Sequence, residues 1–176
     1  VVVPMRNEEE FAERTLEALA AQDYVGEWEV ICVDDRSTDR TREILEKFAA
    51  THPKFRVLSL SPDLPVIASP KKRALESAFK IAKYDVLLTI DADCIPRKSW
   101  ITSMAGRFTD GICIVQGPKQ NSGNHSLLHL YQKLETLGYT AMEAAGFSVN
   151  NGNCVIHIIS SHFICKIGNQ RRIKST

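Results

Sequence analysis

The stretch Val86-Leu87-Leu88-Thr89-Ile90-Asp91-Ala92-Asp93 joins a short apolar run to two carboxylates that are two residues apart. A continuous apolar run of this length is typical of a strand buried on both faces of a parallel sheet. The aspartates follow directly, so we expect them at the carboxyl end of that strand. Ligands of open α/β sheets bind at this edge, and paired carboxylates there suit Mg²⁺ or Mn²⁺ carrying a diphosphate.

Strand and helix patterns alternate on both sides of this stretch. Strands are expected at residues 1–4, 28–33, 55–60, 85–90 and 112–116, and helices at residues 8–21, 38–50, 71–83, 97–108 and 126–145. Asn7 is expected to cap the first helix, and Ser37 or Thr38 the second. Residues 61–70 hold three prolines and are expected to form a loop. This order predicts an α/β fold, with a mainly parallel sheet and helices on both faces.

The composition is that of an ordinary globular domain. The 176 residues are 44% hydrophobic and 24% charged, with a formal net charge of +1, which gives no indication of a nucleic-acid partner. The length is enough for one α/β domain with its own core. Five cysteines without a C-x-x-C pair favour a reducing, cytoplasmic setting over a disulfide framework. No apolar run reaches the length of a membrane span.

Three further segments bring charged groups to the same predicted sheet edge. Asp34 and Asp35 follow the second strand, and one of them is expected to accept hydrogen bonds from a nucleotide base or ribose. Residues 4–9 follow the first strand and form either part of a site or a Glu-rich helix start. Residues 71–73, Lys-Lys-Arg, open the third helix, where cations oppose the helix dipole. They indicate either an anionic partner such as a diphosphate or a solvated charge run.

Four motifs, in this order and spacing, resemble those of family 2 glycosyltransferases, which are inverting GT-A enzymes that use nucleotide sugars. They are Val-Val-Val-Pro-Met-Arg-Asn-Glu-Glu (1–9), Val-Asp-Asp-Arg-Ser-Thr-Asp-Arg-Thr (33–41), Lys71 followed by Ala74-Leu75, and Leu-Leu-Thr-Ile-Asp-Ala-Asp-Cys-Ile-Pro (87–96). The resemblance covers about residues 1–153 and implies a GT-A domain truncated at both ends. Residues 154–176 are expected to form an atypical or disordered tail, in which residues 155–159 could form one more strand.

The resemblance also implies roles for individual residues. The implied metal ligands, for Mn²⁺ or Mg²⁺, are Asp91 and Asp93. Asp34 and Asp35 match the acidic pair that contacts uracil and ribose, and Lys71 matches a basic residue near the diphosphate. The implied nucleotide-binding residues come from all four motifs and are Pro4, Arg6, Glu8, Asp34, Asp35, Lys71, Arg73 and Asp91.

The implied function is binding of a UDP-sugar and transfer of its sugar, with inversion, to a hydroxyl of a lipid-linked or saccharide acceptor. Inverting transfer needs a general base, which the family supplies as an Asp well beyond the Asn-Gly-Asn region. No Asp or Glu follows Glu143 here, so we expect donor binding with little or no transfer. The parent protein is expected in the cytoplasm or at the cytoplasmic face of a membrane, with membrane contact through segments outside this chain.

Other functions remain open on the residues alone. A sugar nucleotidyltransferase would share the sheet and the metal, but it usually carries a Gly-rich phosphate loop, and residues 5–9 contain no glycine. A receiver domain would place its acid pair after the first strand rather than the second. A non-catalytic nucleotide-binding remnant would explain the missing base.

Overall fold

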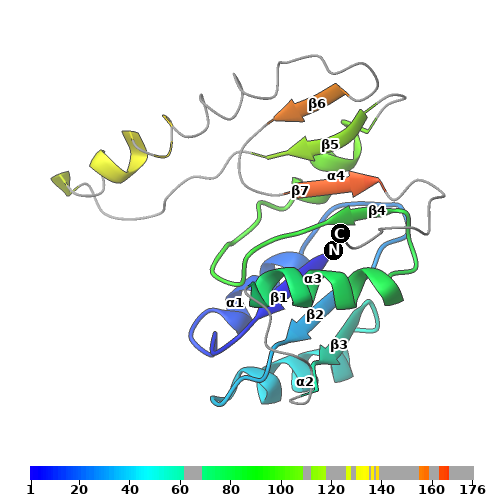
Figure 1. Cartoon of the computed structure of the whole chain (residues 1–176), viewed down its shortest axis with the longest axis vertical. Helices are drawn as coiled ribbons and strands as arrows, with labels where there is room; N and C mark the ends of the chain where they lie inside the picture. Colours follow the sequence, from blue (N-terminus) through cyan, green and yellow to red (C-terminus); the bar gives the residue numbers. More distant parts are fainter. Residues whose placement is uncertain are drawn as a thin grey trace.

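The chain alternates strands and helices as its sequence predicts (Figure 1). A computed structural model describes residues 1–61, 69–108, 112–117, 126–127, 130–134, 136, 138, 155–158 and 163–166. The strands are β1 (Val2–Met5), β2 (Val30–Asp34), β3 (Phe55–Ser59), β4 (Val86–Leu88), β5 (Ile112–Gln116), β6 (Val155–Ile158) and β7 (Phe163–Lys166). The helices are α1 (Ala12–Ala20), α2 (Thr41–Thr51), α3 (Pro70–Ile81) and α4 (Trp100–Ala105).

The described strands form two sheets, which meet where β1 touches β4. In the first sheet, β2 lies between β1 and β3, and all three strands run parallel. In the second, the order is β4-β7-β5-β6, with β7 antiparallel to both of its neighbours. A parallel bridge between Val2 and Thr89 joins the two sheets. The prediction of a mainly parallel sheet is confirmed, and β7 is the exception among the described strands.

Pro4 ends the contact between β1 and β4. Along β1, the carbonyls of Val1 and Met5 accept hydrogen bonds from the β2 side, at 2.8 Å and 2.9 Å. The carbonyl of Val2 instead accepts from the N–H of Ile90 on the β4 side (3.2 Å). Polar groups alternate between neighbours along a parallel strand, so Pro4 faces β4 like Val2. Proline has no N–H to donate, and the ladder therefore stops after Val2.

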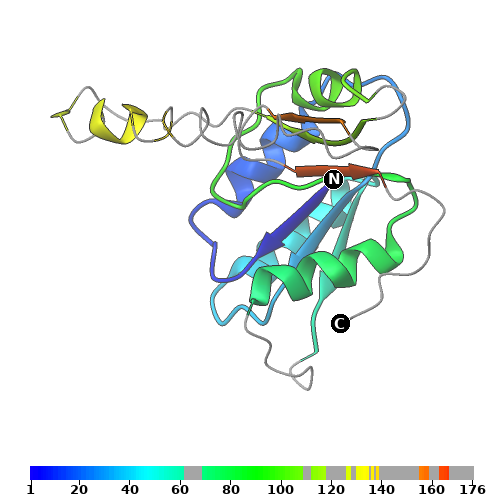
Figure 2. The ribbon, with the colours of Figure 1, turned by 45° about the horizontal axis from the view of Figure 1, so that its top comes forward.

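Helices cover both faces of the parallel strands because side chains alternate along each strand. Val3 and Met5 pack on the face covered by α1, α2 and α4, whereas Val2 packs on the face covered by α3. Figure 2 shows α1 and α3 on opposite sides of these strands. The small residues Ala74 and Ala78 are fully buried and bring α3 close to the sheet. Helices on both faces were predicted, and this is confirmed.

Helix α1 begins later than predicted, at Ala12 rather than Glu8. Asn7 has a φ of 55°, so the chain adopts a left-handed conformation there instead of entering a helix. The Asn7 side chain accepts a hydrogen bond from the N–H of Thr38 in the neighbouring loop (2.8 Å). The prediction that Asn7 caps this helix is therefore wrong, because its acceptor is used between loops.

Helix α2 also begins late, at Thr41 rather than Thr38, and has no side-chain cap. The hydroxyl of Ser37 accepts from the N–H of Asn7 (3.1 Å), while Asp39 accepts from the N–H of Thr41 (3.0 Å). The prediction of a Ser37 or Thr38 cap is therefore wrong for the same reason as in α1.

The remaining predicted elements shift at their ends. Helix α3 starts at Pro70, with Ser69 as its cap, and α4 covers only part of the predicted residues 97–108. Strand β5 has the predicted bounds. The predicted helix at 126–145 lies largely outside the described residues, as does most of the loop at 61–70.

Two strands lie beyond the domain boundary expected at residue 153. Strand β6 pairs with β5, and β7 pairs with both β4 and β5, so sheet structure extends into the expected tail. Residues 159–162 and 167–176 of that tail lie outside the described part of the chain. Within the part that is described, no helix combines the length and the apolar character needed to span a bilayer.

Glu29 ties three elements together just before β2. Its buried carboxylate accepts hydrogen bonds from the N–H of Lys83, after α3, at 2.7 Å and from the Arg56 guanidinium of β3 at 3.0 Å. Burial by itself would raise the pKa of Glu29. The hydrogen bonds from Lys83 and Arg56 outweigh it and hold this pKa below its ordinary value.

We expect Glu29→Ala to lower the free energy of unfolding at pH 7 by about 1–3 kcal/mol, because the Lys83 amide and part of Arg56 lose their acceptor. The folded-state pKa is depressed, so the contribution exists above the unfolded pKa and is lost as pH falls through the folded one. Urea unfolding at pH 7 and pH 3 should show the difference shrinking at low pH. Exposed Glu27→Ala is the control, and an equal loss in both variants would contradict this assignment.

Candidate functional site

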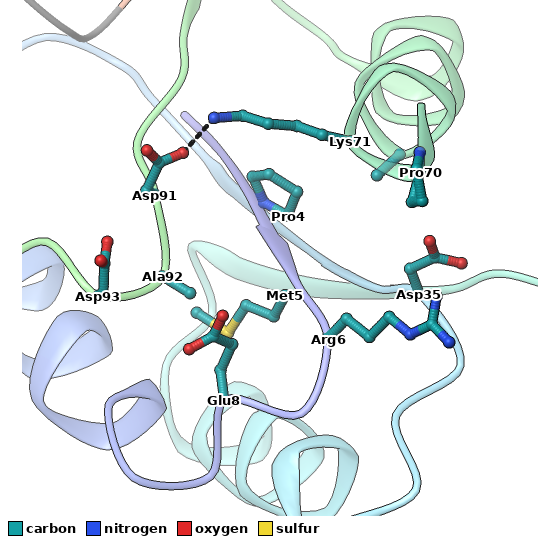
Figure 3. A pocket seen from close by; sticks show the side chains of 11 residues that line it. Pro4, Met5, Arg6, Glu8, Asp35, Pro70, Lys71, Asp91, Ala92 and Asp93 are labelled. Atoms are coloured by element: carbon teal, nitrogen blue, oxygen red, sulfur yellow. Dashed lines mark hydrogen bonds and ion pairs between the residues drawn. The ribbon is translucent and has the colours of Figure 1, made fainter. Parts of the chain in front are cut away.

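A cavity of about 360 Å³ opens between the carboxyl ends of β1 and β4 and the start of α3 (Figure 3). The chain passes from β1 to β2 and β3 on one side and to β4 on the other, and open α/β sheets bind ligands at such a switch point. The strands part here because Pro4 ends their ladder. The lining residues come from the four sequence motifs and their neighbours: Pro4, Met5, Arg6, Glu8, Asp35, Pro70, Lys71, Ala74, Asp91, Ala92 and Asp93.

The two predicted metal ligands lie on the turn Asp91–Cys94, which we call the acidic turn. The N–H of Cys94 donates to the carbonyl of Asp91 (3.1 Å) and closes the turn. Ala92 is buried in the core between the two aspartates, which both line the cavity. One oxygen of each carboxylate and the Cys94 sulfur all lie within 4.8 Å of one another.

Lys71 reaches from the first turn of α3 to the acidic turn. Its ammonium group forms an ion pair with Asp91, drawn as a dashed line in Figure 3. Both side chains are partly exposed, so the pair contributes little to stability. It does place a mobile point charge at the cavity, where an anion could replace Asp91 as its partner.

The adjacent acids Asp34 and Asp35 have different surroundings. Asp35 lines the cavity, and both of its oxygens accept from Nη2 of Arg73, at 2.7 Å and 2.8 Å. Asp34 instead accepts from the N–H of Ser37 (3.1 Å) and closes the turn after β2. Asp34 is absent from the lining of this cavity, whereas Asp35 and Arg6 lie next to each other at one end of it (Figure 3).

Arg73 is buried rather than exposed at the cavity. Its side chain is 7% exposed and that of Asp35 is 4% exposed, so the two charges form a buried pair. Truncating one member of such a pair is costly because the other charge is left buried. Arg73 was predicted near a diphosphate; the structure places it against Asp35, where it holds that carboxylate in one orientation.

Glu8 reaches the cavity because two loops are bonded together. The backbone N–H groups of Asn7, Glu8 and Glu9 donate to side-chain oxygens of Ser37, Thr41 and Asp39, respectively, at 3.1 Å, 2.8 Å and 3.2 Å. These bonds fix the loop after β1 against the loop after β2. Burial, followed by the negative charges of Asp93, Asp39 and Asp91, raises the pKa of Glu8 above its ordinary value.

The donor set fits a hard divalent cation. Asp91 and Asp93 offer carboxylate oxygens close enough to share an ion, and Mg²⁺ and Mn²⁺ prefer such ligands. Burial raises the pKa of Glu8 most, and the nearby negative charges of Asp93, Asp39 and Asp91 raise it further. Cys94 adds a softer sulfur atom to the cluster, which hard cations do not need.

Some lining residues were not singled out from the sequence. Met5, Ala74 and Ala92 lie inside the quoted motifs, and Pro70 directly precedes Lys71, but none of the four was predicted as a site residue. Their apolar side chains carry no chemical signature of their own.

Replacing Glu8 by Gln should stabilise the metal-free protein at pH 7, because an ionised carboxylate beside Asp93 and Asp91 is removed. The folded-state pKa is raised, so the wild type loses stability as pH rises from the ordinary value of 4.5 through the folded one. The variant should lack this loss, as measured by urea unfolding in EDTA at pH 4 and pH 7. Exposed Glu10→Gln is the control; a Glu8→Gln protein less stable than wild type at pH 7 would be the contrary result.

Comparison with known proteins finds a relative that matches most of this chain. The undecaprenyl-phosphate 4-deoxy-4-formamido-L-arabinose transferase of Pectobacterium carotovorum subsp. carotovorum (strain PC1) is 30% identical over 180 residues, which cover 94% of this chain and 51% of the relative. The chain therefore spans about half the length of that relative.

Two solved structures resemble the chain. The first is S. aureus TarS 1–349 in complex with UDP-GlcNAc, which has 27% sequence identity and a TM-score of 0.56 and covers 71% of this chain and 35% of TarS. The second is the mannosyltransferase PcManGT from Pyrobaculum calidifontis in complex with GDP-Man and Mn²⁺. It has 20% identity and a TM-score of 0.66, with 94% of this chain and 43% of the other covered. The predicted GT-A fold is confirmed.

The profile of Glycosyl transferase family 2 matches residues 1–158, which extends past the boundary expected at residue 153. This match covers most of the chain and includes all four motifs and the whole lining of the cavity. The chain belongs to glycosyl transferase family 2.

Proposed function

We propose that this chain is the donor-binding part of a hexosyltransferase-type glycosyltransferase and that its cavity holds a UDP-sugar together with Mn²⁺ or Mg²⁺. The observation that carries the proposal is the convergence of Asp35, Lys71, Asp91 and Asp93 on one cavity from three separate motifs. The Asp35 carboxylate can accept hydrogen bonds from a base, the Lys71 ammonium group can bind a diphosphate, and the paired acids Asp91 and Asp93 can bind a divalent ion.

The nucleoside is proposed to lie at the end of the cavity formed by Pro4, Arg6 and Asp35. Arg73 donates to both oxygens of Asp35 and Arg36 donates to Oδ1 (3.1 Å), which keeps the carboxylate in one orientation and leaves a lone pair on Oδ2 to accept from a base or ribose. The TarS complex with UDP-GlcNAc supports the choice of a UDP-sugar. Asp34, which closes the turn behind Asp35, is proposed to act only through that turn.

The diphosphate and the cation are proposed to lie at the other end, between Lys71 and the acidic turn. Asp91 and Asp93 would hold the cation, which when bound neutralises the departing nucleoside diphosphate as a Lewis acid. Lys71 would exchange its pairing with Asp91 for a phosphate oxygen, since an ammonium group binds phosphate as a point charge. The Mn²⁺ complex of PcManGT supports this choice of metal.

The acceptor side of the reaction is proposed to lie outside this chain. An inverting transfer needs a general base, and the sequence contains no Asp or Glu after Glu143. The undecaprenyl-phosphate transferase of Pectobacterium supports a lipid-linked acceptor, and a saccharide is the other candidate. The parent protein would then work at the cytoplasmic face of a membrane, and this chain would bind the donor with little or no transfer.

The first test is calorimetric titration with UDP in Mn²⁺ and again in EDTA. We expect saturable binding that needs the metal, and Asp93→Ala should reduce the affinity in Mn²⁺ to that seen in EDTA. The control is Asp85→Ala, an exposed aspartate just before the start of the same strand. Unchanged metal dependence in Asp93→Ala would remove the metal assignment. A folded wild-type chain, checked by circular dichroism, that binds no UDP would contradict the proposed donor site.

A second test separates the two adjacent acids. We expect Asp35→Asn to weaken UDP binding in Mn²⁺ on the order of ten- to hundredfold, because a hydrogen bond to a charged group contributes about 1.5–3 kcal/mol. The ratio of affinities in Mn²⁺ and EDTA should stay the same. Asp34→Asn is the matched control and should have the smaller effect, since its acceptor faces the N–H of Ser37. The reverse ranking would move the nucleoside contact to Asp34.

A further inference from the structure

One side chain of helix α1, that of Thr15, contacts the backbone of the acidic turn. Thr15 is fully buried in the middle of this helix, 0% exposed. Its hydroxyl donates to the carbonyl of Ala92 at 2.6 Å and lies 3.2 Å from the carbonyl of Cys94. Both carbonyls belong to the acidic turn, so a residue that is distant in sequence contacts its backbone between and just after the two aspartates.

This contact lies beyond the end of β4, where the chain has left the sheet. Strand β4 ends at Leu88, and two residues later the N–H of Ile90 donates to the carbonyl of Val2 in β1 (3.2 Å). In the acidic turn, one oxygen of Asp91 and one of Asp93 lie within 4.8 Å of each other.

A single cation needs its ligand oxygens close together. At metal–oxygen distances of about 2.0–2.1 Å, two ligands of one Mg²⁺ are at most about 4.2 Å apart, and the limit for a slightly larger ion is similar. A turn free to open would present the two carboxylates at unsuitable separations, and small losses of geometry at a site are costly. The contact from Thr15 opposes such opening.

We propose that Thr15 is a positioning residue for the cation site, because its hydroxyl fixes the backbone of the turn that carries Asp91 and Asp93. This inference rests on the proposed function. Thr15 does not line the cavity. From its buried position on a helix alone, one would expect it to have only a packing role.

The effect of removing the hydroxyl should stay local. The segment after the acidic turn is anchored to the end of α1 by other bonds. Gln22 donates to the carbonyl of Arg97 (2.8 Å) and accepts from the N–H of Ile101 (3.0 Å), and the N–H of Asp23 donates to Lys98 (3.0 Å). These bonds do not involve Thr15, so its loss releases the turn while the following residues stay attached.

The test compares Thr15→Val, which keeps the shape and removes the hydroxyl, with Thr15→Ser, which keeps the hydroxyl. Free Mn²⁺ is measured by electron paramagnetic resonance as the full 176-residue chain is titrated at saturating UDP. We expect Mn²⁺ affinity to fall about tenfold or more in Thr15→Val, the loss typical of residues that orient metal ligands, and to stay near wild type in Thr15→Ser. The control is Thr102→Val on α4, which loses a bond to Asp23 (2.7 Å), a residue just after α1, without touching the turn.

Affinity is measured on protein shown to be folded by circular dichroism, so lower stability alone does not change the readout. Should Thr15→Val fail to fold, Thr15→Ala takes its place with the same expected loss. Wild-type Mn²⁺ affinity in the hydroxyl-free variant would overturn the role of Thr15 alone. A wild-type chain that binds no Mn²⁺ would overturn both this role and the proposed function.

Discussion

The break between β1 and β4 is the constraint on which the site depends. The strands touch through Val2 and Thr89, and the next residue of β1 that faces β4 is Pro4, which cannot donate a hydrogen bond. A residue with an N–H there could continue the ladder and close the gap. The cavity exists because it does not continue, and the polar ends of β1, β2 and β4 line the space that results.

The charged side chains around the cavity have two kinds of surroundings. Asp35 and Arg73 are both buried and bonded to each other, so their charges largely cancel and their geometry is fixed. Glu8, Asp91 and Asp93 lie close enough for their charges to be felt in the raised pKa of Glu8. One end of the cavity is thus built for directional hydrogen bonding and the other for attracting a cation.

Much of this arrangement could be predicted from the sequence. The apolar runs located the parallel strands, and parallel strands present their carboxyl ends at one edge, so the convergence of Glu8, Asp35 and Asp91 follows from the order of elements. The sequence could not predict that Asp35 lines the cavity and Asp34 does not, because this difference depends on the exact residue at which the strand ends. The late starts of α1 and α2 depend on bonds between two loops, and local capping rules cannot include those. The burial of Arg73 was hidden because a run of three basic residues suggests a solvated surface.

The first turn of α3 carries one further consequence. Lys71 and Arg73 are two residues apart on that turn, yet Lys71 pairs with Asp91 and Arg73 with Asp35. A displacement of this turn therefore alters both contacts at once. Under the proposed placement of the cation and the nucleoside, the two would be coupled through this one element, and by reciprocity each ligand would change the affinity for the other by the same factor.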